Sequence, residues 1–163
     1  MTQAIVEAIG VAPTWLRVII LTIIPVTEYQ LSVPLGLLDY HLTPILVIAL
    51  AWVGGALIFF PLYFGLLRLR TFCVQYLPWL VVPLDRFLAR GERKLGSHYK
   101  DYGMIGLLLF FLIPLPLTGV WTATFGAVAL KIPLKQAAVG ILLGLLIGAT
   151  VVTVLTVGVG SLF

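Results

Sequence analysis

The stretch LTPILVIALAWVGGALIFFPLYFGLL, residues 42–67, runs for 26 residues without a charged side chain. A membrane-spanning helix needs about 20 mostly apolar residues to cross a hydrocarbon core ~30 Å thick. Residues 134–162 form a second stretch of this kind, with Lys135 at its start. The sequence therefore predicts one complete transmembrane helix in each half of the chain.

The composition of the whole chain indicates that lipid surrounds it. Of its 163 residues, 61% are hydrophobic and 10% are charged, and the mean hydropathy is +1.17. An ordinary soluble domain carries roughly 25% charged residues. A soluble enzyme, a disordered tail and a disulfide scaffold are therefore excluded, and the lone cysteine, Cys73, is expected in the core.

Two further apolar stretches, residues 15–38 and 104–130, are interrupted. The residues that disfavour a continuous helix are Pro25, Pro34 and Gly36 in the first, and Pro114, Pro116 and Gly119 in the second. Broken backbone at membrane depth is tolerated only where protein or a water-filled cavity satisfies the freed N–H and C=O groups. We therefore expect two re-entrant helical hairpins; the alternative is four ordinary spans with proline kinks.

The distribution of basic residues favours the hairpins. If the hairpins do not cross, nine of the ten basic residues share one face of the membrane: Arg68, Arg70, Arg86, Arg90, Arg93, Lys94, Lys100, Lys131 and Lys135. Four full spans would divide them between both faces. The positive-inside rule then makes the shared face cytoplasmic and places both chain ends outside.

An internal repeat supports the same division. A shift of 89 positions lays Pro25 on Pro114, Pro44 on Pro133, and Gly55 on Gly144. We expect one all-α membrane domain, residues 1–163, in which two inverted repeats, 13–67 and 103–163, each combine a hairpin with a span. The linker between them, 68–102, is expected at the membrane surface and to contain an amphipathic helix.

Glu28 is the first candidate for function because it is the only acidic residue inside any of the four apolar stretches. An ionisable side chain at membrane depth is costly, and function is its default explanation. Burial favours the protonated form of a carboxyl group, which suits proton exchange. The alternative is a carboxylate at a water-exposed hairpin mouth that caps the next helical turn.

Other polar residues of the hairpins could complete a proton or substrate site. They are Tyr29, Gln30 and Ser32 in the first hairpin and Thr118, Trp121 and Thr122 in the second. The alternative for each is repair of broken backbone or, for Trp121, anchoring at the lipid interface.

Small residues on the last span suggest close helix packing. Gly140, Gly144 and Gly148 recur every fourth residue and form one ridge. Its partner is either the first span near Gly54 and Gly55 or a second copy of the chain.

No catalytic, metal or cofactor site is expected. His41 and His98 are predicted on opposite faces, and the sequence has no G-x-x-x-x-G-K-[ST] or H-E-x-x-H motif. A Ser/His/Asp set would have to span the membrane, so we do not expect an enzyme.

Two motifs resemble those of a known family. Residues 114–123, PLPLTGVWTA, are close to P-L-P-G-T-G-x-W-T-G, with Leu117 and Ala123 in place of glycines. Residues 28–36, EYQLSVPLG, are similar to E-L-R-x-A-I-P-x-G, with Gln30 in place of the arginine. In this order the motifs resemble the small multidrug export family, related to the DedA superfamily of membrane proteins.

The resemblance implies two facing re-entrant hairpins, each followed by a span. It also implies drug export or, by analogy with DedA relatives, proton-dependent transport or movement of lipids between leaflets. The missing arginine weakens any implied binding of anions.

The leading functional hypothesis is a small proton- or ion-coupled exporter of a cationic or neutral molecule, with Glu28 as its exchanging group. The alternatives are a lipid or undecaprenyl-phosphate translocase and a non-transporting membrane scaffold. Expected partners are membrane lipids, a small-molecule or lipid substrate and, alternatively, a second copy in a homodimer, but no nucleic acid. The expected location is a prokaryotic plasma membrane.

Overall fold

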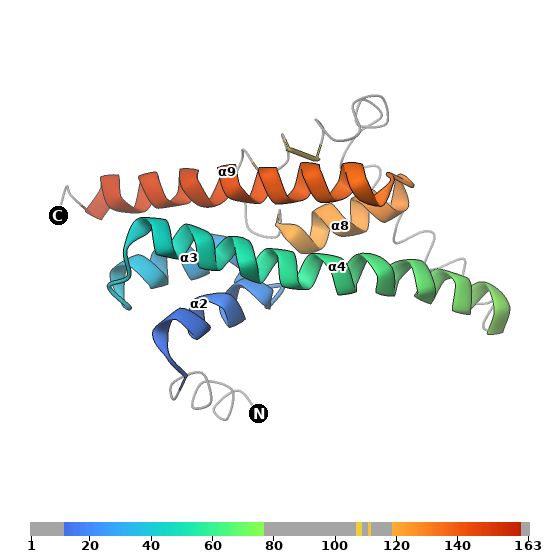
Figure 1. The fold of residues 1–163 in the computed structure, drawn as a ribbon, viewed down its shortest axis with the longest axis horizontal. Helices are drawn as coiled ribbons and strands as arrows, with labels where there is room; N and C mark the ends of the chain where they lie inside the picture. Colours follow the sequence, from blue (N-terminus) through green and yellow to red (C-terminus); the bar gives the residue numbers. More distant parts are fainter. Residues whose placement is uncertain (1–11, 77–106, 109–110, 112–118, 161–163) are drawn as a thin grey trace.

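The computed structural model describes residues 12–76, 107–108, 111 and 119–160, and this part of the chain is all-helical, as predicted. Its five helices, shown in Figure 1, are α2 (Thr14–Ile23), α3 (Glu28–Leu38), α4 (Pro44–Tyr76), α8 (Val120–Ala129) and α9 (Leu134–Gly160). Predictions for residues 77–102 of the linker, for the two chain ends and for Pro114, Pro116 and Thr118 lie outside the described residues.

The first interrupted stretch forms a helical hairpin. α2 and α3 have 10 and 11 residues, so each is about 15 Å long and about half the length of a full span. Their side chains meet in antiparallel register: the hydroxyl oxygens of Thr22 and Ser32 lie 2.6 Å apart, and Gly36 packs against Val18. Pro25 lies in the break between the two helices.

The breaks predicted at Pro34 and Gly36 are absent, because both residues lie inside α3. Proline removes one backbone donor without ending this helix. Gly36 serves packing instead, because a Cβ there would lie 3.0 Å from a methyl carbon of Val47 and 3.1 Å from one of Val18. The glycine thus lets α3 approach both α2 and α4.

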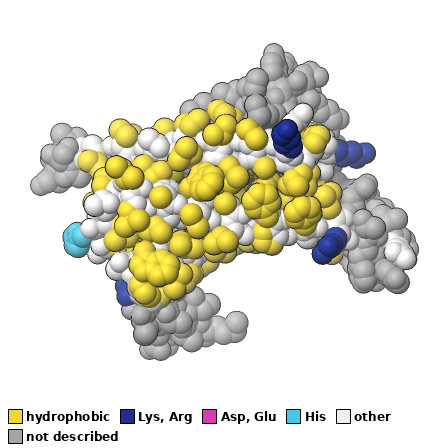
Figure 2. Space-filling view, viewed as in Figure 1, with side chains coloured by type: hydrophobic (Ala, Val, Ile, Leu, Met, Phe, Trp, Pro, Cys, Tyr) yellow, Lys and Arg dark blue, Asp and Glu magenta, His cyan; other side chains and the backbone are white. Residues whose placement is uncertain are grey.

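Two described helices are long and apolar enough to cross a membrane, over Pro44–Leu69 and Leu134–Gly158. They agree with the predicted spans except that α4 continues as helix to Tyr76, into the region predicted as linker. Figure 2 shows one face of the molecule covered mainly by hydrophobic side chains, with Lys and Arg toward the ends.

α4 and α9 run side by side in opposite directions (Figure 1). Near the first half of α4, the Trp52 indole N–H donates to the Leu142 carbonyl at 3.0 Å. Farther along α4, the Tyr63 hydroxyl donates to the carbonyl of Ile132, just before α9, at 2.8 Å. The later residue of α4 thus pairs with the earlier residue in the second half of the chain. The two helices are therefore antiparallel.

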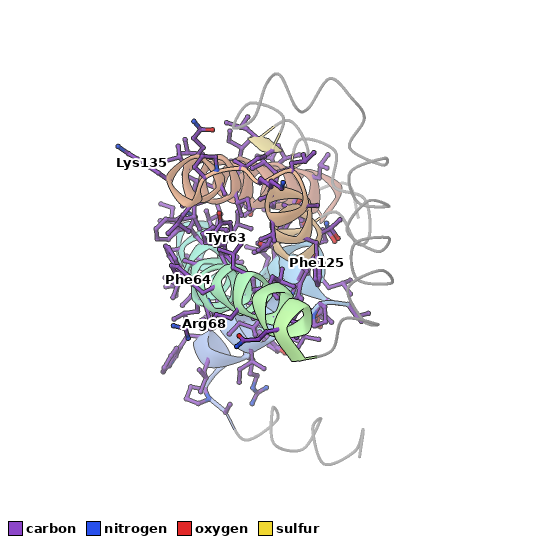
Figure 3. The ribbon with its side chains drawn as sticks, turned by 90° about the vertical axis from the view of Figure 1, so that its right-hand side faces the viewer. Tyr63, Phe64, Arg68, Phe125 and Lys135 are labelled. Atoms are coloured by element: carbon purple, nitrogen blue, oxygen red, sulfur yellow. The ribbon has the colours of Figure 1, made fainter. Side chains whose placement is uncertain are left out.

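One end of the helix pair carries exposed basic residues. Figure 3 views the molecule from this side, with Tyr63 between α4 and α9 and Lys135 extending away from the helices. Arg68, near the end of the apolar part of α4, and Lys131 are also exposed. The antiparallel pairing therefore places basic residues from both halves at the same end.

The glycine ridge of α9 faces residues of the same chain. A Cβ at Gly144 would lie 2.6 Å from the Phe111 ring, and one at Gly148 would lie 2.9 Å from the Tyr29 hydroxyl oxygen. Gly140 is also buried. Next to the ridge, Leu145 of α9 packs on Gly55 of α4, in agreement with the predicted contact, whereas Gly144 and Gly148 themselves face Phe111 and Tyr29.

We expect Gly144→Ala to lower the free energy of unfolding by about 1–3 kcal/mol, because the rigid Phe111 ring must move. Gly158→Ala is the matched control on the same helix, since a Cβ there meets nothing within 4 Å. Thermal unfolding of the purified protein in detergent measures both effects. An equal effect of the two substitutions would contradict the packing described.

Candidate functional site

The tip of the α2–α3 hairpin lies near the middle of both long helices. α2 approaches α4 closely at Gly54, where a Cβ would lie 3.0 Å from the Ile19 carbonyl oxygen and 3.0 Å from the Thr22 Cβ. Gly54 lies close to the midpoint of Pro44–Leu69, and Gly148, beside the Tyr29 hydroxyl, lies close to the midpoint of Leu134–Gly158. The helix break is therefore placed at the depth where a membrane would be driest.

Glu28 is the first residue of α3 and is buried, with 2% of its surface exposed. Its φ of +42° lies in the left-handed region that non-glycine residues rarely adopt. Its Oε1 accepts a hydrogen bond from the backbone N–H of Trp121 at 3.2 Å. Its Oε2 is also buried, lies beside the Gly119 backbone, and makes no hydrogen bond of ordinary geometry with the described residues.

The Glu28 carboxylate lies at the start of α8, which belongs to the other half of the chain. α8 begins at Val120, directly after Gly119, and its first backbone N–H groups have no partner within the helix. The positive end of the helix dipole also favours a carboxylate there. Glu28 therefore does not cap its own helix at a water-exposed mouth, as the alternative interpretation held, but caps α8 in the interior.

Trp121 makes the reverse connection between the two halves. Its indole N–H donates to the carbonyl of Ile23, the last residue of α2, at 2.9 Å. This carbonyl belongs to the helix end where backbone acceptors lack partners within the helix. We call the four residues Ile23, Glu28, Gly119 and Trp121 the tip contact, because each half satisfies a broken helix end of the other.

Gly119 is required for the carboxylate to come so close. A Cβ at Gly119 would overlap the carboxylate of Glu28. Its φ of −101° is accessible to any residue, so the glycine is needed for space and not for backbone conformation. The absence of a side chain at Gly119 thus allows the Glu28 carboxylate to approach the backbone closely.

The other predicted residues are placed less directly. The Ser32 hydroxyl binds Thr22 within the hairpin, and because Thr22 donates to the Val18 carbonyl, Ser32 donates to Thr22. Gln30 and Thr122 are half-buried on α3 and α8. Ser32 therefore contributes to the packing of the α2–α3 hairpin, while Trp121 and Glu28 take part in the tip contact.

Tyr29, predicted to supply a hydrogen-bonding group beside Glu28, lies next to it in the first turn of α3. Its side chain is fully buried, and its hydroxyl has no hydrogen-bond partner among the described residues. The sequence indicated Tyr29 by its position next to Glu28. Tyrosine also stands where the similar motif has leucine. Within the described part of the chain, no three His, Cys, Asp or Glu side chains gather as metal ligands.

Comparison with known protein families identified a match. The family described as "Putative small multi-drug export protein" matches residues 28–151, which run from Glu28 into α9. The chain belongs to this family. Membership and the two long apolar helices together indicate a membrane protein of the small multi-drug export family. Comparisons with curated proteins and with solved structures gave no match.

We expect Gly119→Ala to lower the free energy of unfolding by about 1–3 kcal/mol, because the Glu28 carboxylate must leave the start of α8. The same substitution in a Glu28→Ala background should cost much less, since no carboxylate occupies the space. Chemical denaturation of the four variants in detergent measures this coupling. Equal costs of Gly119→Ala in both backgrounds would show that the two residues do not touch.

Proposed function

We propose that this protein exports a cationic or neutral small molecule in exchange for protons, with Glu28 binding the proton and the substrate in turn. The observation that carries this proposal is the position of Glu28: its carboxylate is buried where two broken helices meet, near the middle of both long helices. Broken helices that meet near the midplane hold the substrate and the coupling ion in many secondary transporters.

The opposite directions of α4 and α9 support an inverted repeat with re-entrant hairpins. If residues 15–38 and 104–130 were full spans and the linker did not cross, the two long helices would be parallel. They are antiparallel, as expected if each half crosses the membrane once. The shared basic end, with Arg68, Lys131 and Lys135, is then the cytoplasmic end.

The surroundings of Glu28 suit a group that gains and loses a proton. Desolvation penalises a charged carboxylate, and the hydrogen bond from Trp121 and the start of α8 oppose that penalty. Because the two effects oppose each other, the free energies of the protonated and ionised forms differ less than they would under either effect alone. The unpartnered Oε2 supplies the position at which a proton or an ammonium group binds.

The charges favour a cationic or neutral substrate over an anionic one. The start of α8, which would otherwise attract a phosphate group, already holds the Glu28 carboxylate. The basic side chains resolved in the described part of the chain, Arg17, Arg68, Lys131 and Lys135, lie near helix ends and away from the tip contact. A phosphate-bearing lipid would therefore meet a negative group without a compensating cation from these residues.

We expect Glu28→Gln to abolish transport that depends on a pH gradient, because glutamine keeps the shape but cannot exchange a proton. The measurement is uptake of tetraphenylphosphonium by liposomes containing the protein, with an imposed pH gradient. Asp39→Asn is the matched control, since Asp39 is an exposed acidic residue just after α3.

The control should transport like the wild type, and both variants should show wild-type thermal unfolding or a change small enough to exclude misfolding. Gradient-dependent uptake by Glu28→Gln at the wild-type rate would contradict the proposal. Movement of labelled lipid between leaflets without any gradient would favour the lipid translocase instead.

A further inference from the structure

The Tyr29 hydroxyl is a buried polar group without a visible structural role. The side chain is 0% exposed, and no described group is placed to hydrogen-bond its hydroxyl. The neighbouring Gln30 side chain approaches the hydroxyl without reaching hydrogen-bond geometry. Buried tyrosine hydroxyls usually find a partner, and each exception calls for an explanation.

Other buried hydroxyl groups among the described residues do have hydrogen-bond partners. Thr124 and Thr153 each donate to the carbonyl four residues earlier in their helix, at 2.6 and 2.8 Å. The Tyr63 hydroxyl donates to the Ile132 carbonyl at 2.8 Å. Tyr29 and Glu28 are the described residues whose buried side-chain oxygens lack a partner, and they are adjacent in the first turn of α3.

The packing of α9 against Tyr29 is a second observation about this hydroxyl. Gly148 of α9 lies opposite the Tyr29 hydroxyl. A Cβ at Gly148 would lie 2.9 Å from the hydroxyl oxygen and 3.1 Å from Cε2 of the Tyr29 ring. A phenylalanine would fill nearly the same volume without burying an unpaired oxygen, which is unfavourable. Gly148 therefore leaves room for a hydroxyl that makes no hydrogen bond with the described residues.

We propose that Tyr29 determines substrate specificity, by donating a hydrogen bond from its hydroxyl to an acceptor atom of the substrate held at Glu28. This inference rests on the proposed function. It names the substrate class more closely: an organic ammonium compound that also carries an ether or carbonyl oxygen.

The chemistry of the two groups selects this class. The free oxygen of the Glu28 carboxylate attracts the ammonium group, and the phenolic O–H of Tyr29 is a donor that an oxygen atom can accept. The Phe111 ring, 6.1 Å from the Tyr29 ring between centroids, adds an apolar wall beside the hydroxyl.

Two cations that differ at one atom test the proposal. Benzyloxyethyl-trimethylammonium carries an ether oxygen where 4-phenylbutyl-trimethylammonium carries a methylene group. Their dissociation constants are measured with the protein in lipid nanodiscs, with binding to empty nanodiscs subtracted. Tyr29→Phe should weaken binding of the ether compound about fivefold relative to the hydrocarbon compound, which corresponds to one ordinary hydrogen bond.

Tyr63→Phe is the matched control, because it removes a buried tyrosine hydroxyl whose partner is the Ile132 carbonyl. It should lower the thermal midpoint and leave the ratio of the two dissociation constants unchanged. Tyr29→Phe should leave the thermal midpoint unchanged or raise it. A merely structural role for the Tyr29 hydroxyl would give the opposite stability result and no change in the ratio.

A third variant separates this inference from the proposed function. Glu28→Gln should weaken binding of both cations. If it weakens both while Tyr29→Phe leaves their ratio unchanged, the inference about Tyr29 is wrong and the proposed function stands. If Glu28→Gln binds both cations as tightly as the wild type does, the proposed function itself is wrong.

Discussion

Unpaired backbone groups cannot be left at a helix end in a medium without water, and the arrangement of this protein follows from that constraint. α2 ends and α8 begins near the middle of the long helices, where hydrocarbon supplies no hydrogen bonds. Trp121 satisfies the carbonyl of Ile23, and Glu28 accepts the N–H of Trp121. Each half of the chain completes the broken backbone of the other, so neither the end of α2 nor the start of α8 can be packed alone.

The same contact connects structure with the proposed transport cycle. A carboxylate that holds the start of α8 cannot bind an ammonium ion or a proton without changing that interaction. In the proposed cycle, occupation of Glu28 therefore alters how firmly the α2–α3 hairpin and α8 hold each other. The left-handed backbone of Glu28 is consistent with a position fixed by its surroundings, since such strain persists where the structure over-determines it.

Composition and apolar length were enough to predict an all-helical chain with two long helices, because both depend on local sequence. The break near Pro25 and the burial of Glu28 also follow from local patterns, namely a proline and an isolated charge. Pro34 and Gly36 were misread because a breaking residue can serve packing, and Gly36 does so against Val18 and Val47. Trp121, 93 positions from Glu28, was predicted in the same site, but its hydrogen bond through the backbone N–H could not be found from spacing. The inverted repeat, the orientation in the membrane and the relation to the DedA superfamily stay predictions.

Proton release on ligand binding tests the central claim most directly, because it asks whether Glu28 exchanges a proton for a cation. Purified protein in weakly buffered detergent solution is mixed with tetraphenylphosphonium, and the change in pH is recorded for the wild type and for Glu28→Gln. We predict that the wild type releases protons as the cation binds and that Glu28→Gln releases none. Binding without proton release from the wild type, or equal release from both proteins, would contradict the account.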